Sequence, residues 1–112
     1  MSIVATIEDW NKLDIRVGEV LDVKDFPEAR KPAYRLWIDF GEALGVKQSS
    51  AQITELYDKE DLQGRQVIAV VNFPPLRIAG FKSEVLVLGV YAKEGVVLLQ
   101  PDRNVRKGDK IG

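Results

Sequence analysis

The sequence contains neither cysteine nor histidine among its 112 residues. These absences exclude disulfides, thiol nucleophiles, iron–sulfur clusters, zinc sites built from Cys and His, and the imidazole base of many enzymes. No glycine-rich phosphate-binding loop occurs, and no base accompanies Ser49, Ser50 or Ser83 to activate a hydroxyl nucleophile. We therefore expect a protein that is not an enzyme and that carries no metal and no cofactor.

An excess of charge of either sign is absent as well. The 16 Lys and Arg residues balance 17 Asp and Glu residues, and the net charge of −1 argues against non-specific binding of nucleic acid. The longest apolar run, residues 85–92, is interrupted by Gly89 and is far shorter than the ~20 residues of a membrane-spanning helix. No secretory signal pattern is visible at the N-terminus. We expect one cytoplasmic domain over residues 1–112, without membrane insertion.

Local patterns in the first third of the chain predict one helix and two strands. Thr6 with Asp9 forms a helix-start box, which predicts a short helix over residues 6–12. Apolar and polar residues alternate in two stretches that follow it, as they do in half-buried strands. The predicted strands are residues 14–23, bent at Gly18, and residues 33–40.

The rest of the chain predicts further short strands and a second helix. Residues 53–62 indicate a helix, with Asp58 and Asp61 as its capping pair and Gly64 as its end. The remaining strands are predicted over residues 46–49, 67–71, 85–90 and 96–99. This order is typical of an all-β fold with little helix, an OB-fold five-stranded barrel with a helix inserted between strands three and four. An SH3-like barrel is the alternative.

Two of the predicted strands are apolar on both faces. Antiparallel barrel strands usually alternate, but residues 85–88 and 96–99 do not. Leaving four or five outward side chains in water would lose several kcal/mol of hydrophobic stabilisation, at about 25 cal/mol per Å² of apolar surface left unburied. We therefore expect a homodimer that buries these runs together with the N- and C-terminal extensions. In the alternative, the N-terminal helix covers them within one chain.

Two loops of the predicted barrel occupy the positions where OB folds bind ligands. They are residues 25–32 and residues 72–83, and the second is long, apolar and basic. No Asp or Glu lies between Leu62 and Ser83. Together with the outward face of strands two and three, this composition predicts an apolar cleft with a basic rim. The candidate site comprises Trp37, Lys47, Ser49, Ser50, Gln52, Asn72, Phe73, Arg77, Ile78, Phe81, Lys82 and Ser83.

Each part of the candidate site also has a purely structural interpretation. Phe73 and Phe81 could pack down as a lid on the barrel, and Trp37 could lie beneath a dimer partner. Lys47 and Arg77 could be solvated charges, worth ~0–1 kcal/mol each when paired. The basic C-terminal residues are interpreted as a solubilising tail rather than a nucleic-acid patch: Arg103, Arg106, Lys107 and Lys110.

Several motifs resemble a known family. Residues 12–18, Lys-Leu-Asp-Ile-Arg-Val-Gly, with Pro-Glu-Ala at 27–29, resemble the tRNA-binding OB domain of EMAP II-like proteins and methionyl-tRNA synthetases. Residues 48–54, 71–75 and 78–89 look like the branch of export-related CsaA chaperones. This resemblance implies an OB barrel, a homodimer formed through terminal extensions, and a pocket on each subunit. It further implies that Asn72, Arg77 and Ser83 match nucleic-acid-binding positions.

Two functions follow as hypotheses. The first is an ATP-independent chaperone that holds unfolded or pre-export polypeptides in the cleft and assists export, in contact with the export machinery. The second is a structure-specific tRNA-binding protein that uses the same face, with bases stacked on the aromatic side chains and phosphates on the cations. A catalytic domain is the least favoured reading because no general base is present.

Overall fold

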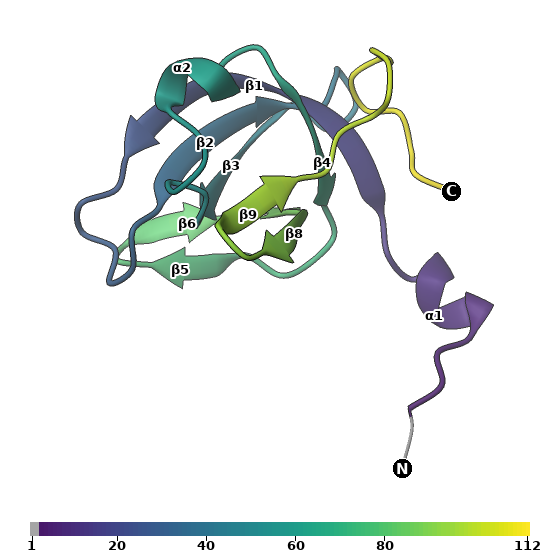
Figure 1. The fold of residues 1–112 in the computed structure, drawn as a ribbon. Coiled ribbons are helices and arrows are strands. Elements are labelled where there is room, and N and C mark those ends of the chain that lie inside the picture. Colours follow the sequence, from purple (N-terminus) through teal and green to yellow (C-terminus); the bar gives the residue numbers. More distant parts are fainter. Residues whose placement is uncertain (1–2) are drawn as a thin grey trace.

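The computed structural model describes residues 3–112, which form a small β-barrel with one helix projecting from it (Figure 1). The elements in chain order are α1 (Ile7–Asn11), β1 (Ile15–Asp25), β2 (Tyr34–Asp39), β3 (Val46–Ala51), α2 (Lys59–Leu62), β4 (Gln66–Val70), β5 (Leu76–Ile78), β6 (Phe81–Ser83), β7 (Leu86–Val87), β8 (Gly89–Ala92) and β9 (Gly95–Leu98). Five strands form an antiparallel sheet in the order β3-β2-β1-β4-β7, and two hairpins, β5–β6 and β8–β9, complete the fold. The predicted OB-fold barrel, with a helix between the third and fourth strands, is confirmed.

The barrel core follows from the alternation of residues in β2. Leu36 and Ile38 are fully buried, whereas Trp37 between them is only half-buried. Alternate residues of a strand point to opposite faces of the sheet, so one face of β2 lies in the core. Other apolar residues of the core pack around these two: Val20, Val23, Tyr34, Phe40, Ala51, Ile53, Leu62, Val67, Ala69, Val85 and Leu98.

The first strand contains an irregularity that the sequence did not predict. Beyond Gly18, where a bend was predicted, the register between β1 and β2 shifts between Val20 and Asp22, and β1 has one extra residue there. Gly18 serves another purpose. A Cβ at this position would lie 2.5 Å from Ile38 Cγ2 and 2.7 Å from Phe40 Cε1. The glycine is needed because core side chains lie directly against the backbone of β1.

The predicted helix over residues 53–62 is confined to its end, α2. The predicted capping pair is present, because the Asp61 carboxylate accepts a hydrogen bond from the Asp58 N–H at 3.0 Å. Before the cap, the Tyr34 hydroxyl donates to the Tyr57 carbonyl at 2.8 Å. This bond to β2 holds the preceding residues in turns, so tertiary contacts override the local helix preference.

The stretch predicted as a long loop, residues 72–83, contains the hairpin β5–β6. Ala79 and Gly80 form its turn with φ angles of 47° and 83°, the left-handed pair that two-residue hairpins favour. Each strand of the hairpin has three residues. Strands this short give no alternation that could be recognised in the sequence, and the prediction of an open loop is wrong.

The predicted strand over residues 85–90 is divided between two sheets. β7 pairs with β4 in the main sheet, and the chain then leaves the sheet to form β8 of the outer hairpin. A Cβ at Gly89 would lie 2.5 Å from Val96 Cγ1, so only glycine allows the two strands of this hairpin to approach so closely. A single long strand was therefore the wrong prediction for this run.

The N-terminal helix does not cover the apolar runs. α1 is capped by the predicted box of Thr6 and Asp9, but it projects away from the barrel and none of its residues is buried (Figure 1). Leu86 and Val97 remain 49% and 41% exposed. The alternative of cover within one chain is therefore wrong. No helix within residues 3–112 has the length and apolar character needed to cross a membrane.

The C-terminal segment is part of the fold, which corrects its interpretation as a solubilising tail. It runs beside the first half of β1, where the Gly108 N–H donates to the Val17 carbonyl at 2.7 Å. The Arg16 guanidinium donates to the Asp14 carboxylate at 2.6 Å and to the Gly108 carbonyl at 3.1 Å. The hydrogen bond to Asp14 raises the pKa of Arg16.

The close packing at Gly18 gives a prediction about stability. Gly18→Ala should lower the free energy of unfolding by roughly 1–3 kcal/mol, because the new methyl group overlaps two core side chains. Urea denaturation measures the effect. Gly112→Ala is the control, since a Cβ there meets no atom within 4 Å. Equal stability of the two variants would contradict the packing argument.

Candidate functional site

The register of β2 and β3 divides the predicted site residues between two faces. Directly opposite residues of antiparallel strands point to the same side, and Trp37 is opposite Gln48. These two side chains therefore lie on the outer face of the barrel. Lys47 and Ser49 are opposite buried residues of β2 and lie on the core side. The predicted site therefore contains residues from both faces of the sheet, because neighbouring residues of a strand point to opposite sides.

Three aromatic side chains from different elements meet on the outer face, and we call this surface the aromatic face: Phe26, Trp37 and Phe81. Phe81 of β6 contacts Phe26 with a centroid distance of 5.5 Å and Trp37 with one of 5.9 Å, both edge to face. Such pairs contribute about 0.5–1.5 kcal/mol each beyond the burial of area. Phe26 is buried, while Trp37 and Phe81 are half-buried. The hairpin β5–β6 thus folds onto the strands and presents an apolar surface that remains partly accessible.

Two cations that the sequence analysis missed flank the aromatic face. Lys24 Nζ lies 5.6 Å from the centroid of the Trp37 ring, and Arg35 Cζ lies 5.5 Å from that of Phe26. Lys24 of β1 and Arg35 of β2 are opposite each other in the register. Cations over aromatic rings at exposed sites contribute about 0.5–1 kcal/mol each. The alternation of β2 was the signal that could have found Arg35, since it is two residues from Trp37 on the same face.

Gln48 connects the hairpin to the barrel, and the sequence analysis did not single it out. Its side-chain oxygen accepts from Trp37 Nε1 at 3.2 Å, and its side-chain nitrogen donates to the Lys82 carbonyl at 2.8 Å. Its backbone N–H donates to the Glu84 carboxylate at 3.1 Å, and its carbonyl accepts from the Glu84 N–H at 2.8 Å. One glutamine therefore fixes the indole, the hairpin and the edge of β3 relative to one another.

Two predicted site serines are buried and close the barrel. The Ser49 hydroxyl, with 0% exposure, donates to the Val85 carbonyl at 3.0 Å. The Ser83 hydroxyl accepts from the Ser50 N–H at 3.0 Å. These bonds join β3 to the last residue of β6 and to the chain that follows it. Ser49 and Ser83 therefore position the site, and the structure does not bring their hydroxyls to its surface.

Asn72 is exposed, but its amide is engaged within the chain. Its side-chain oxygen accepts from the Asp14 N–H at 2.8 Å, and its side-chain nitrogen donates to the Lys12 carbonyl at 2.7 Å. These bonds hold the segment between α1 and β1 against the end of β4. The position predicted as a ligand contact is occupied by the protein's own backbone.

The two cations of the hairpin lie on its outer face. Arg77 is opposite Lys82 in the register, whereas Ile78 is opposite Phe81. Since neighbouring residues of a strand point to opposite sides, Arg77 and Lys82 point away from the side on which Phe81 meets the other aromatic rings. Both are exposed, and Arg77 Nη1 donates to the Gly80 carbonyl at 3.4 Å.

The remaining predicted residues lie at different depths in the structure. Ser50 is opposite Arg35 and is half-buried. Gln52 is exposed beyond the end of β3, and Phe73 is 42% exposed before the hairpin. The arrangement offers apolar area at its centre and cations at its margins, with a few uncommitted polar groups.

Comparison with known proteins places this geometry in a family. The model of the family described as "Putative tRNA binding domain" matches residues 15–110. Methionine–tRNA ligase from Thermococcus onnurineus is 38% identical over 104 residues, which cover 93% of this chain and 14% of that protein. The chain thus spans about a seventh of the length of the ligases it matches.

Solved structures match over the whole chain. The CsaA chaperone protein from Picrophilus torridus is 55% identical, with a TM-score of 0.94 and coverage of 97% of this chain and 100% of that one. The CsaA chaperone from Bacillus anthracis is 58% identical, with a TM-score of 0.92 and coverage of 98% and 100%. The chain belongs to the tRNA-binding domain family, and within it to the CsaA branch.

Proposed function

We propose that this protein is an ATP-independent chaperone that binds unfolded or pre-export polypeptides on the aromatic face of each subunit of a homodimer and assists their export. Its similarity to the two CsaA chaperone structures supports this role. The observation that carries it is the half-buried pair of Trp37 and Phe81, flanked by the cation Lys24.

The chemistry of the aromatic face suits an unfolded chain. Apolar side chains of the ligand can lie on Trp37 and Phe81, and its acidic side chains can approach Lys24, Arg35 or the more distant Lys82. Ser50 and Gln52 are available for hydrogen bonds to an extended backbone. Contacts of this kind recognise features that most unfolded proteins share. The sequence also lacks a phosphate-binding loop, so binding and release need no nucleotide.

Substitution of the aromatic side chains tests the chaperone role. Phe81→Ala and Trp37→Ala should each weaken binding of a permanently unfolded protein roughly tenfold, because each removes apolar contact area worth about 1–2 kcal/mol. Fluorescence anisotropy with labelled, reduced and carboxymethylated α-lactalbumin gives the affinity. Leu56→Ala, which removes a 42% exposed apolar side chain elsewhere, should leave it unchanged. Wild-type affinity in both aromatic variants would exclude this face.

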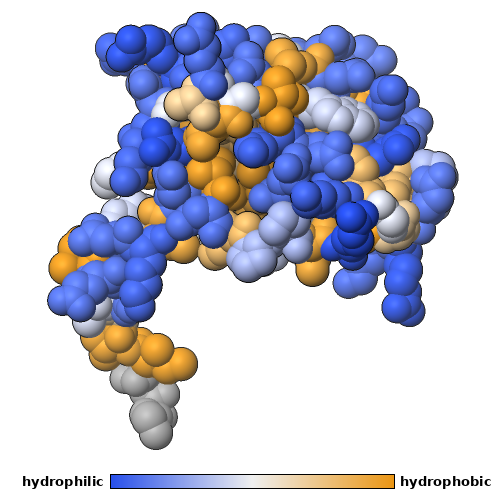
Figure 2. Space-filling view, turned by 180° about the vertical axis from the view of Figure 1, so that it is seen from behind, coloured by the Kyte–Doolittle hydropathy of each residue, from blue (hydrophilic) through white to orange (hydrophobic). Residues whose placement is uncertain are grey.

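The homodimer is supported by the apolar surface that a single chain leaves exposed. Leu86, Val97 and Leu99 are 49%, 41% and 38% exposed, and Ile3 and Val4 on the N-terminal arm are 97% and 80% exposed. Figure 2, which views the barrel from behind, shows the apolar side chains of this arm standing clear of the barrel. A second copy would remove these side chains from water by a twofold contact.

Sedimentation equilibrium tests the dimer. Leu86→Ser should weaken self-association at least tenfold, because it replaces the apolar side chain that the proposed dimer buries with a polar hydroxyl group. Leu21→Ser is the control, since Leu21 is 41% exposed on β1 outside the apolar runs. A monomeric wild-type protein at micromolar concentration, or equal association of both variants, would refute the proposed interface.

The second candidate function is structure-specific binding of tRNA, which the family match favours. Arg77 and Lys82 are exposed on the outer face of the hairpin, beside a stretch without acidic residues. Phosphates could lie on these cations while unpaired bases stack on the aromatic face.

Salt dependence distinguishes this function. If tRNA binds here, log affinity should fall linearly with log salt concentration, and Arg77→Ala should reduce the slope by about 0.7–0.9. Arg103→Ala, which removes an exposed cation of the C-terminal segment, should leave the slope unchanged. Electrophoretic mobility shifts over a salt series give both values. Absence of a shift at low salt would rule out the tRNA function.

A further inference from the structure

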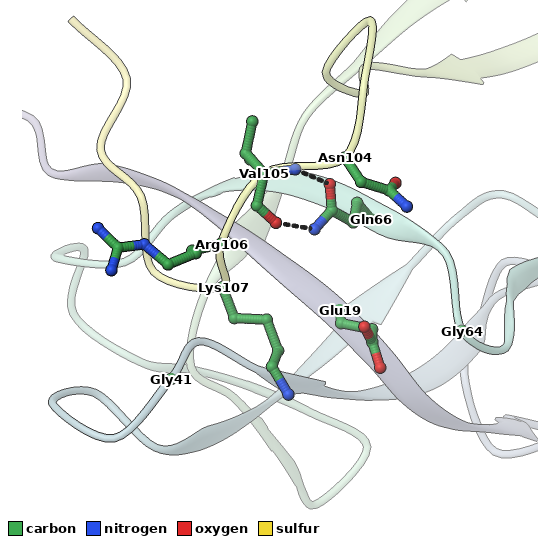
Figure 3. A pocket seen from close by; sticks show the side chains of 8 residues that line it. All are labelled: Glu19, Gly41, Gly64, Gln66, Asn104, Val105, Arg106 and Lys107. Atoms are coloured by element: carbon green, nitrogen blue, oxygen red, sulfur yellow. Dashed lines mark hydrogen bonds between the residues drawn. The ribbon is translucent and has the colours of Figure 1, made fainter.

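A hollow of about 410 Å³ lies where the C-terminal segment crosses the barrel (Figure 3). Glu19 of β1, Gly41 after β2, Gly64 and Gln66 around the start of β4, and residues 104–107 line it. In Figure 1 the C-terminal segment is at the opposite end of the barrel from the hairpin β5–β6. The hollow is therefore separate from the aromatic face.

Its wall is held in place by specific contacts. The Gln66 side chain donates to the Val105 carbonyl at 2.6 Å and accepts from the Val105 N–H at 3.1 Å (Figure 3). A Cβ at Gly41 would lie 2.8 Å from the Lys107 carbonyl oxygen. The segment is thus packed directly on the turn after β2, with its backbone bonded to β4. These contacts fix the position of the segment and therefore the shape of the hollow beneath it.

The hollow carries charges of both signs, but only some of them are directly paired. Glu19 is directly opposite Asp39 in the register of β1 and β2, where like charges destabilise a sheet. Lys107 Nζ bonds to Asp39 Oδ2 at 3.0 Å. The Gly41 N–H, and then Lys107, hold the pKa of Asp39 below its ordinary value. Within residues 3–112 the Glu19 carboxylate has no hydrogen bond or ion pair: Lys107, whose raised pKa owes something to Glu19, is bonded to Asp39 instead, so Glu19 has no direct partner in the hollow.

A second polar group lies on the same side. Figure 3 shows Asn104 and Glu19 on one side of Val105, while the Arg106 side chain extends to the other side of the C-terminal segment. The Asn104 amide forms no hydrogen bond within residues 3–112. Its oxygen is an acceptor that could share the N–H donors of a cation bound to Glu19. Glu19 thus favours a positively charged ligand, and Asn104 offers that ligand a hydrogen-bond acceptor.

We propose that this hollow binds a small organic cation whose ammonium or guanidinium group pairs with Glu19 and hydrogen-bonds to Asn104. The volume lies within the ~300–1,000 Å³ typical of small-molecule sites. A metal ion is a poorer fit, because the residues from 3 to 112 contain no group of three acidic, Cys or His side chains that could hold one. A cation bound there would form an ion pair with Glu19, as Lys107 does with Asp39.

Titration with agmatine, which carries both a guanidinium and an ammonium group, tests the site. In ¹H–¹⁵N correlation spectra of the full chain, saturable shifts should concentrate at the backbone amides of Glu19, Gly64, Gln66 and Asn104. Glu19→Gln should weaken the binding roughly tenfold or more, since it removes the charge that the cation pairs with.

A matched control separates this site from general attraction to acidic residues. Glu94→Gln makes the same change at an exposed carboxylate in the turn between β8 and β9 and should leave the affinity unchanged. Shifts distributed over all surface carboxylates, equal affinity in the Glu19 and Glu94 variants, or no saturation would each overturn the proposal. Loss of polypeptide binding is not expected for Glu19→Gln, so the result is independent of the chaperone assay.

Discussion

The rest of the barrel depends on the need to satisfy the backbone hydrogen-bonding groups along the outer edge of β3. A sheet edge exposes N–H and C=O groups that need partners, and β3 has a backbone ladder only with β2. Glu84 bonds to Gln48 through both backbone and side chain, and Ser83 bonds to the N–H of Ser50. Because the chain must return to this edge after β6, the hairpin is drawn across the outer face. Phe81 is thereby placed against the indole of Trp37, so the closure of the barrel also forms the candidate site.

The features that the sequence predicted correctly are those set by neighbouring residues. The alternation over residues 33–40 defines β2 because each side chain there is either in the core or outside it. The capping pair of Thr6 with Asp9 spans one helical turn and needs no distant partner. The fold class followed from the order of such local elements. Phe81 was predicted from the long segment in which it stands and Trp37 from the alternation of β2, whereas Phe26 was not among the predicted site residues.

The errors arise where distant contacts decide the outcome. The turn structure before α2 depends on a bond to Tyr34, and the role of Gly18 depends on side chains of β2. Asn72 was read as a free amide because the backbone groups that it bonds lie 58 and 60 residues away in the chain. Lys24 was overlooked because its relation to Trp37 depends on the register across the extra residue of β1. Sequence patterns identify which residues are apolar or charged, but cross-strand register decides which of them meet.

The distribution of hydrogen-bonding groups supports the proposal that the aromatic face binds many different polypeptides. A binding site discriminates strongly when its own buried polar groups would lose their partners with the wrong ligand. Here the polar side chains of Gln48 and Ser83, which border the aromatic face, already have partners within the protein. A ligand of any sequence therefore leaves few of them unsatisfied. What remains is apolar area with cations at its margin, which would favour exposed hydrophobic segments and impose little penalty for their sequence. The proposed low selectivity would then follow from closing the barrel with the same side chains that border the face.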